Sequence, residues 1–135
     1  MILVSACLCG INSKYNGKNN YNEEIFNMVK KGIAIPVCPE QLGGLSTPRV
    51  PSEIKNGRVI NKEGIDVTDN FKKGALEVLE LCKKLNINKV ILKSKSPSCG
   101  KGLIYSGDFD GKLVEGNGIL TELLLKNDIE VITYD

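Results

Sequence analysis

The sequence contains no histidine among its 135 residues. Histidine is the side chain whose pKa lies nearest to neutrality, and it is the commonest metal ligand. Its absence removes the usual base and the usual zinc ligand. Any acid–base step in this protein therefore depends on aspartate, glutamate, serine, tyrosine, lysine or cysteine.

Long apolar runs and long runs of one charge are also missing. The apolar segments are far shorter than the ~20 residues that cross a bilayer, and the first residues lack the basic segment and cleavage site of a secretory signal. The 18 basic and 16 acidic residues are interleaved and give a net charge of +2, so no basic arm indicates nucleic-acid binding. We therefore expect a cytoplasmic protein without a membrane or nucleic-acid partner.

The number of cysteines, five, is odd and fits poorly with a disulfide framework. In a reducing cytosol, cysteines are more often metal ligands or reactive thiols. The length suits one domain that buries a core without disulfide bonds, so we expect residues 1–135 to form a single domain. The sequence leaves open whether the protein forms a homodimer.

Four short apolar segments have the pattern of central strands that are covered on both faces: residues 2–5, 33–37, 89–92 and 130–134. Helices are predicted between them, over 23–31 after an Asn22 cap, over a longer segment capped by Thr68 or Asp69, and over 119–126. One face of the long helix carries Phe71, Ala75, Val78, Leu79, Cys82 and Leu85. This order predicts an α/β, three-layer Rossmann-like fold with a mostly parallel central sheet of about four strands.

Two segments interrupt this pattern. Residues 41–67 contain an Asn56-Gly57 turn between two strand-like segments, and residues 100–118 are rich in glycine, with Asp110-Gly111 as a second turn. Each follows a cysteine-bearing strand end. We therefore expect two small hairpins that form walls or lids of a pocket.

Three cysteines stand just after predicted strands: Cys7, Cys38 and Cys99. The carboxyl ends of parallel strands share one edge of the sheet, where such folds bind ligands, so these thiols are expected to meet there. Three thiolates could hold three corners of a [4Fe–4S] cluster and leave one iron open as a Lewis acid. The alternative is that they are small apolar side chains of the core.

The other two cysteines have different environments. Cys82 lies on the apolar face of the long helix and is expected in the core. Cys9 follows Cys7 closely and could be a spare ligand, a resolving thiol or a packed side chain, of which packing is favoured.

Polar side chains accompany the three strand-end cysteines. Glu40 follows Cys38 and could transfer a proton or activate water, or else simply pair with Arg49. Hydroxyls near Cys99 could orient a polar ring, and nearby cations could attract a phosphate, although serine is also common in ordinary loops. These residues are Ser94, Ser96 and Ser98, with Lys93, Lys95, Lys101 and Arg49 as the cations.

Three segments resemble the motifs of the DUF523 family, whose characterised members are thiouracil desulfidases. They are Val4-Ser5-Ala6-Cys7, the run from Pro36 to Arg49, and the run from Leu92 to Gly100. The resemblance covers nearly the whole chain. It implies an α/β fold and a [4Fe–4S] cluster held by Cys7, Cys38 and Cys99.

The same resemblance implies non-redox removal of sulfur from a thiolated pyrimidine. The soft thiocarbonyl sulfur would bind the open iron, and water would then attack the ring carbon. Glu40 is the first choice for proton transfer and Ser96 the second, while Ser94, Ser98, Arg49 and Lys101 are candidates for substrate binding. A free thiolated uracil, its nucleoside or its monophosphate is the expected substrate, rather than RNA.

Three other interpretations are compatible with the sequence. One is a structural or binding protein whose cysteines hold zinc or another metal without turnover. Another is a cluster-free thiol enzyme that acts through Cys7 or Cys38. The third is a nucleotide-binding module, which only the fold class and the glycine-rich loops suggest, because neither phosphate-loop motif is present.

Overall fold

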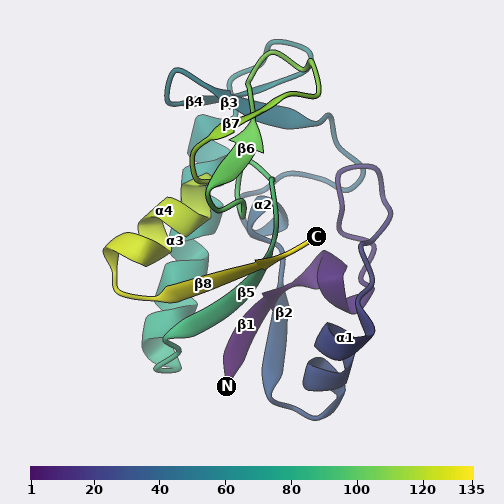
Figure 1. Cartoon of the computed structure of the whole chain (residues 1–135), viewed down its shortest axis with the longest axis vertical. Coiled ribbons are helices and arrows are strands. Elements are labelled where there is room, and N and C mark those ends of the chain that lie inside the picture. Colours follow the sequence, from purple (N-terminus) through teal and green to yellow (C-terminus); the bar gives the residue numbers. More distant parts are fainter.

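A parallel four-stranded sheet forms the centre of the computed structural model, which describes residues 1–135 (Figure 1). The strand order is β2-β1-β5-β8, and every neighbouring pair is parallel. The strands are β1 (Ile2–Ser5), β2 (Ala34–Val37), β5 (Lys89–Lys93) and β8 (Glu130–Tyr134). The predicted sheet is confirmed.

Helices cover both faces of this sheet. Helices α3 (Thr68–Lys84) and α4 (Ile119–Lys126) lie on one face, and α1 (Glu23–Lys30) lies on the other (Figure 1). Side chains alternate accordingly, since Leu3 packs toward α3 and α4 whereas Val4 packs toward α1. The three-layer prediction is confirmed. Among the helices, none has both the length and the apolar composition that a membrane span requires.

The helix boundaries agree with the sequence at α1 and α4 and differ at α3. Asn22 caps α1, because its side chain accepts the N–H of Ile25 at 3.2 Å. At α3 the predicted cap is wrong: Val67 precedes the helix, and the buried hydroxyl of Thr68 instead accepts the N–H of Val59 at 2.8 Å. Leu85 is 44% exposed rather than in the core, because the helix ends at Lys84.

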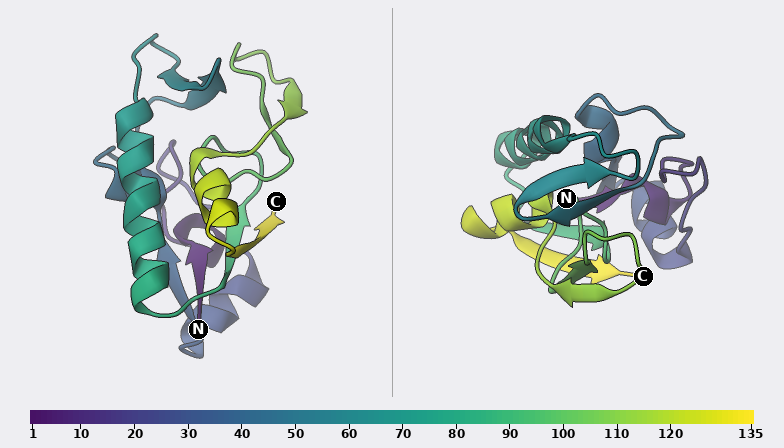
Figure 2. Two further views of the ribbon diagram at one scale, coloured as in Figure 1. Left: turned by 90° about the vertical axis from the view of Figure 1, so that its left-hand side faces the viewer. Right: turned by 90° about the horizontal axis from the view of Figure 1, so that it is seen from above.

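The two predicted hairpins are present. One pairs β3 (Ser52–Lys55) with β4 (Arg58–Asn61), and the other pairs β6 (Leu103–Tyr105) with β7 (Leu113–Glu115). Figures 1 and 2 show both hairpins beyond the carboxyl ends of the central strands. They are therefore placed to wall a site at that edge of the sheet.

Two short helices at this edge were not predicted. A 3₁₀ helix, η1 (Ala6–Cys9), follows β1 directly, and α2 (Pro39–Leu42) follows β2. Each is one turn long, too short for a periodic pattern in the sequence. Cys7 lies inside η1, and Cys38 is the residue that precedes α2, with Pro39 at its first position.

Two glycines allow α2 to contact α3. A Cβ atom at Gly74 would overlap the carbonyl oxygen of Pro39, and one at Gly43 would overlap that of Asn70. The absence of a side chain at these positions brings α2, and with it Cys38, against the long helix.

We expect the Gly74→Ala variant to lose about 1–3 kcal/mol of stability, because the added methyl group must displace the backbone of α2. Alanine normally favours a helix, so the expected sign is opposite to that of helix propensity. Urea unfolding followed by circular dichroism measures the loss. The control is Lys73→Ala at the exposed neighbouring position, and equal stability of the two variants would contradict the close approach.

Candidate active site

One cavity of about 480 Å³ lies at the carboxyl edge of the sheet. Cys7, Cys38 and Cys99 all line it. Segments that are far apart in the chain therefore bring three thiols to one place, as the strand-end argument predicts. A cavity of this size is in the range that holds a small-molecule ligand.

Local structure fixes each of the three cysteines. Cys7 lies in η1, which Gly10 ends in a left-handed conformation (φ +97°) that glycine adopts readily. Cys38 lies between β2 and α2. Cys99 ends a tight turn in which Ser96 Oγ accepts the N–H of Cys99 at 2.7 Å.

Polar groups contact the three cysteines. Ser5 Oγ donates to Cys99 Sγ at 3.7 Å, and Cys38 Sγ lies 3.8 Å from the carbonyl oxygen of Ser13. The backbone N–H of Asn20 donates to the carbonyl oxygen of Cys7 at 2.9 Å. Burial raises the pKa of Cys7 above its usual value and raises the pKa of Cys99 to about 12. These two are neutral thiols in the metal-free chain, and a bound metal must displace their protons.

The donor set suits an iron–sulfur cluster better than a single metal ion. No three cysteine or acidic side chains lie close enough together to hold one ion, and the chain has no histidine. The three cysteines nevertheless share one cavity. In a cluster, each thiolate binds a different iron, so its ligands stand farther apart than those of a mononuclear zinc site.

The remaining cysteines lie outside this cavity. Cys9 is buried on the α1 side of the sheet, where its thiol contacts the carbonyl oxygen of Ala6 at 3.2 Å. Cys82 is fully buried in the core between the sheet and the helices α3 and α4. The expectation that both are packed side chains is confirmed.

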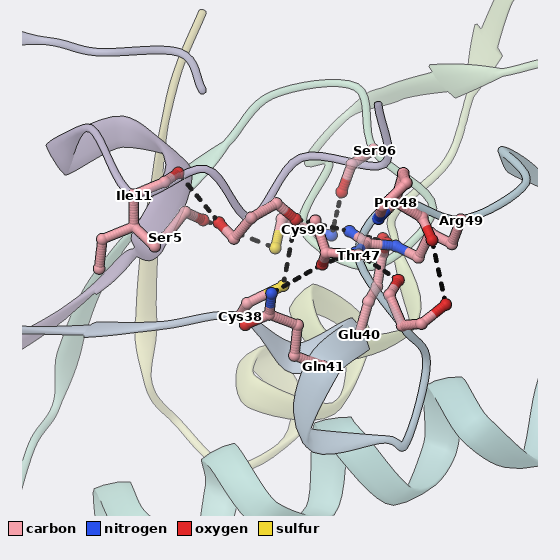
Figure 3. A network of polar contacts seen from close by, with 12 residues as sticks. Ser5, Ile11, Cys38, Glu40, Gln41, Thr47, Pro48, Arg49, Ser96 and Cys99 are labelled. Carbon is pink, nitrogen blue, oxygen red and sulfur yellow. Dashed lines mark hydrogen bonds and ion pairs between the residues drawn. The ribbon is translucent and has the colours of Figure 1, made fainter. Parts of the chain in front are cut away.

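An ion pair between Glu40 and Arg49 forms part of the cavity wall (Figure 3). Arg49 Nε and Nη2 both contact Glu40 Oε2 at 2.7 Å. The side chain of Arg49 is only 9% exposed and that of Glu40 only 15%. The second oxygen, Oε1, has no hydrogen-bond partner in the chain and is not among the fully buried polar atoms. Burial raises the pKa of Glu40, and Arg49 opposes that shift.

The remaining donors of Arg49 are also used within the protein. Nη1 donates to Ser46 O (3.2 Å) and Thr47 Oγ1 (2.8 Å), and Nη2 donates to Ser13 O (2.9 Å). All five donors of the guanidinium therefore have partners within the protein, although Arg49 itself lines the cavity. Arg49 thus connects Glu40 to Ser13, whose carbonyl oxygen also contacts Cys38 Sγ.

We expect the Arg49→Met variant to lose about 3 kcal/mol of stability, because it leaves the largely buried Glu40 without its cation. The control is Arg58→Met, which breaks an ion pair with Asp66 whose side chains are 50% and 40% exposed. That variant should lose far less stability, because solvent screens an exposed ion pair. Urea unfolding of both variants measures the difference, and equal losses would contradict a structural role of the buried pair.

The predicted serines and lysines divide between two places. Ser94, Ser96, Lys93 and Lys95 line the cavity. Ser98 and Lys101, the other two candidates for substrate binding, are not among the residues that line it. The hydroxyl of Ser98 is buried without a partner, and Lys101 Nζ donates to the carbonyl oxygen of Val131 at 2.9 Å.

Several cavity residues were not found from the sequence. Lys14, Tyr15 and Asn20 come from the loop after η1, and Lys62 follows β4. No periodic pattern or motif surrounds them. Ser5 belongs to a predicted strand, but its contact with Cys99 depends on the pairing of β1 with β5.

Fold and site together define an α/β protein with a sulfur-lined ligand cavity and a buried carboxylate beside it. Residues 2–135 match the family model of the 2-thiouracil desulfurases, and the chain belongs to this family.

Two individual relatives support this assignment. The chain is 43% identical over 143 residues to the uncharacterized protein YbbK of Bacillus subtilis (strain 168), covering 98% of this chain and 95% of the relative. A solved structure, the [4Fe-4S]-dependent thiouracil desulfidase TudS (DUF523Vcz), superposes with a TM-score of 0.94 at 40% identity. The match covers 99% of this chain and 90% of that one.

Proposed function

We propose that this protein removes sulfur from thiolated uracil compounds with a [4Fe–4S] cluster bound by Cys7, Cys38 and Cys99, and that residues 1–135 act as one desulfidase domain. The observation that carries the proposal is the convergence of these cysteines on one cavity that also contains Glu40. Membership of the 2-thiouracil desulfurase family and the similarity to a [4Fe-4S]-dependent desulfidase support it.

The overall reaction is a substitution without a change of redox state. The thiocarbonyl carbon gains an oxygen atom from water and loses its sulfur as hydrogen sulfide, so no external oxidant or reductant is needed. A cluster with three cysteine ligands supplies an iron that can accept the soft thiocarbonyl sulfur as a Lewis acid. All other tasks fall to side chains of the cavity.

Glu40 is the proposed acid–base residue. Because Oε2 is occupied by Arg49, the unpaired Oε1 is the oxygen that holds the attacking water and takes its proton. Arg49 is a positioning residue that keeps the carboxylate in this orientation. The proton then remains near the carbon–sulfur bond that has to be broken.

Ser96 and Ser94 are proposed to contact the ring of the substrate. Ser96 Oγ accepts the N–H of Cys99, so its own hydroxyl proton is free to donate to a carbonyl group of the pyrimidine. Ser94 Oγ is 2.6 Å from Asp135 Oδ1, which orients it as a donor to that carboxylate. Lys93 Nζ donates to Ser94 Oγ at 3.3 Å, so Ser94 contributes its one remaining acceptor position to substrate binding.

The charge of the cavity favours an anionic form of the substrate. Five cations and three carboxylates line the cavity, so its side chains carry a net charge of +2 (five minus three). The cations are Arg49 and the lysines Lys14, Lys62, Lys93 and Lys95, and the carboxylates are Glu40, Glu53 and Asp135, of which Asp135 lies 3.7 Å from Lys95. Burial lowers the pKa of Lys93, an effect that a bound phosphate would offset. We propose a thiolated uracil mononucleotide as a better substrate than the free base, with phosphate held by these lysines rather than by Arg49 or Lys101.

The test is anaerobic reconstitution with iron and sulfide, followed by assays with 2-thiouracil, 4-thiouracil and 4-thiouridine monophosphate. The expected result is a brown protein that forms the corresponding uracil compound and sulfide in equal amounts. A colourless zinc-containing protein, or turnover that survives complete removal of iron, would reject the proposal.

A further inference from the structure

The two hairpins are joined beside the cavity by one carboxylate. Glu53 lies in β3, and its Oε1 accepts the backbone N–H groups of Gly107 at 3.0 Å and Phe109 at 3.1 Å. Both of these residues belong to the loop between β6 and β7. Glu53 and Phe109 line the cavity. We refer to Glu53, Gly107 and Phe109 as the clasp.

The clasp holds Phe109 in a conformation that the residue rarely adopts by itself. Its φ is +52°, in the left-handed region that a bulky side chain disfavours. The loop is also fixed from within, because Asp110 Oδ1 accepts both the Ser106 hydroxyl (2.7 Å) and the N–H of Lys112 (3.0 Å). The surrounding contacts thus maintain a strained backbone at a residue of the cavity wall.

Gly107 shows how closely this loop approaches β3. A Cβ atom at this position would overlap the carbonyl oxygen of Ile54, so only glycine allows the approach. An exposed ion pair between Lys55 and Asp108 (2.8 Å) lies alongside but does not involve the cavity. The contact with Glu53 is therefore the one that connects the loop conformation to the cavity.

Aromatic side chains are few, and the cavity contains three of them. Of four tyrosines and three phenylalanines, Tyr15, Tyr105 and Phe109 line it. Both tyrosines are more than one-third exposed, whereas Phe109 is half-buried and entirely apolar. A flat apolar ring of this kind pairs well with the face of a planar heterocycle.

We propose that Phe109 packs its ring against the face of the substrate pyrimidine, and that Glu53 is the positioning residue that holds it there through two backbone N–H groups. The inference rests on the proposed function, because it takes a uracil ring as the ligand. Contact with the face of the ring stabilises the bound substrate and the transition state by the same free energy. It therefore sets affinity and selectivity for a planar ring, not the rate of the chemical step.

The first test removes the ring. In the anaerobically reconstituted protein, Phe109→Ala should raise KM for 4-thiouracil by about 5- to 100-fold and leave kcat within about twofold. Phe109→Tyr should keep the wild-type KM, because it keeps the ring. Calorimetric titration with uracil, which undergoes no reaction, should show the same loss of affinity in Phe109→Ala alone.

The second test separates the acceptor function of Glu53 from its charge. Glu53→Gln retains a side-chain oxygen that can accept both N–H groups, so it should bind uracil as the wild type does. Glu53→Ala removes the acceptor and should weaken uracil binding as Phe109→Ala does. The variant that combines Glu53→Ala with Phe109→Ala should bind uracil no more weakly than either single variant, because both changes act through the same ring.

The control is Lys55→Ala, which breaks the neighbouring exposed ion pair and should leave uracil affinity within about twofold. Unchanged affinity for uracil and unchanged KM in Phe109→Ala, in a folded protein that desulfurates 4-thiouracil, would overturn the stacking role alone. A wild-type protein that neither reacts with 4-thiouracil nor binds uracil would overturn the proposed function as well. A large effect of Glu53→Gln would overturn the positioning role.

Discussion

Replacement of Cys7, Cys38 or Cys99 by alanine is expected to abolish turnover and to prevent retention of a full complement of iron and sulfide. Each thiol lines the same cavity, so each variant would remove one of the three proposed anchors of the cluster. The expected loss of activity exceeds about 10³-fold, because the iron that accepts sulfur is lost together with the cluster. Iron analysis and the visible absorption of anaerobically reconstituted protein measure the effect.

Two cysteines provide matched controls for these variants. Cys9 lies close to Cys7 in the same 3₁₀ helix but faces the core beside α1, and Cys82 is buried beside α3 and α4. Cys9→Ala and Cys82→Ala should keep cluster and activity, with a stability loss of about 1 kcal/mol. Full activity in any variant of the first three cysteines would contradict the ligand assignment.

The Glu40→Gln variant is expected to lose about 10²- to 10⁴-fold in kcat and to keep its cluster absorption. Glutamine has nearly the same shape and can still accept hydrogen bonds from Arg49, but it cannot take a proton from water. Oε1 is the oxygen without a partner in the chain, so loss of its basicity should affect the chemical step directly. Steady-state kinetics together with the visible spectrum separate this effect from loss of the cluster.

Comparison with Ser96→Ala decides between the two candidate acid–base residues. The Ser96 hydroxyl accepts the N–H of Cys99, so its removal should weaken substrate binding and also disturb the turn that carries Cys99. If Glu40→Gln keeps wild-type turnover and Ser96→Ala does not, the assignment of proton transfer to Glu40 is wrong. Glu40→Asp, which retains a carboxylate at a shorter reach, should recover part of the activity.

The sequence predicts the central sheet well, because buried parallel strands have a simple signature. Residues 130–134 contain the β-branched Val131, Ile132 and Thr133 after the turn-forming Asn127-Asp128 pair, and β8 has these bounds. The position of the cysteines follows from the same argument, since the end of a parallel strand determines the edge on which the next residue lies. The strand ends therefore account for Cys7 and Cys38, whereas Cys99 stands six residues after β5 and reaches the same cavity through the turn at Ser96.

Side-chain directions in the loops were much harder to predict. Lys101 stands only two residues after Cys99, yet its ammonium group donates to the carbonyl oxygen of Val131 outside the cavity. The position of Arg49 beside Glu40 likewise depends on hydrogen bonds from its guanidinium to the carbonyl oxygens of Ser13 and Ser46. Such contacts arise from the packing of distant segments, and local sequence patterns do not encode them.

The clasp illustrates a third case, in which the sequence identifies the segment but not its role. The Asp110-Gly111 turn predicts a hairpin, and the hairpin is present. What places Phe109 at the cavity is a carboxylate from the other hairpin, Glu53, together with a close backbone approach at Gly107. The contact between the two hairpins becomes visible only when the chain is folded.

Three cysteines of one cavity are proposed to bind a cluster in which one iron has no protein thiolate. Mössbauer spectroscopy of protein reconstituted with ⁵⁷Fe, before and after addition of 4-thiouracil under anaerobic conditions, distinguishes the iron atoms of such a cluster. Roughly one quarter of the iron signal should change on addition of 4-thiouracil, and the rest should stay the same. An unchanged spectrum during turnover, or a uniform change at every iron, would contradict this proposal.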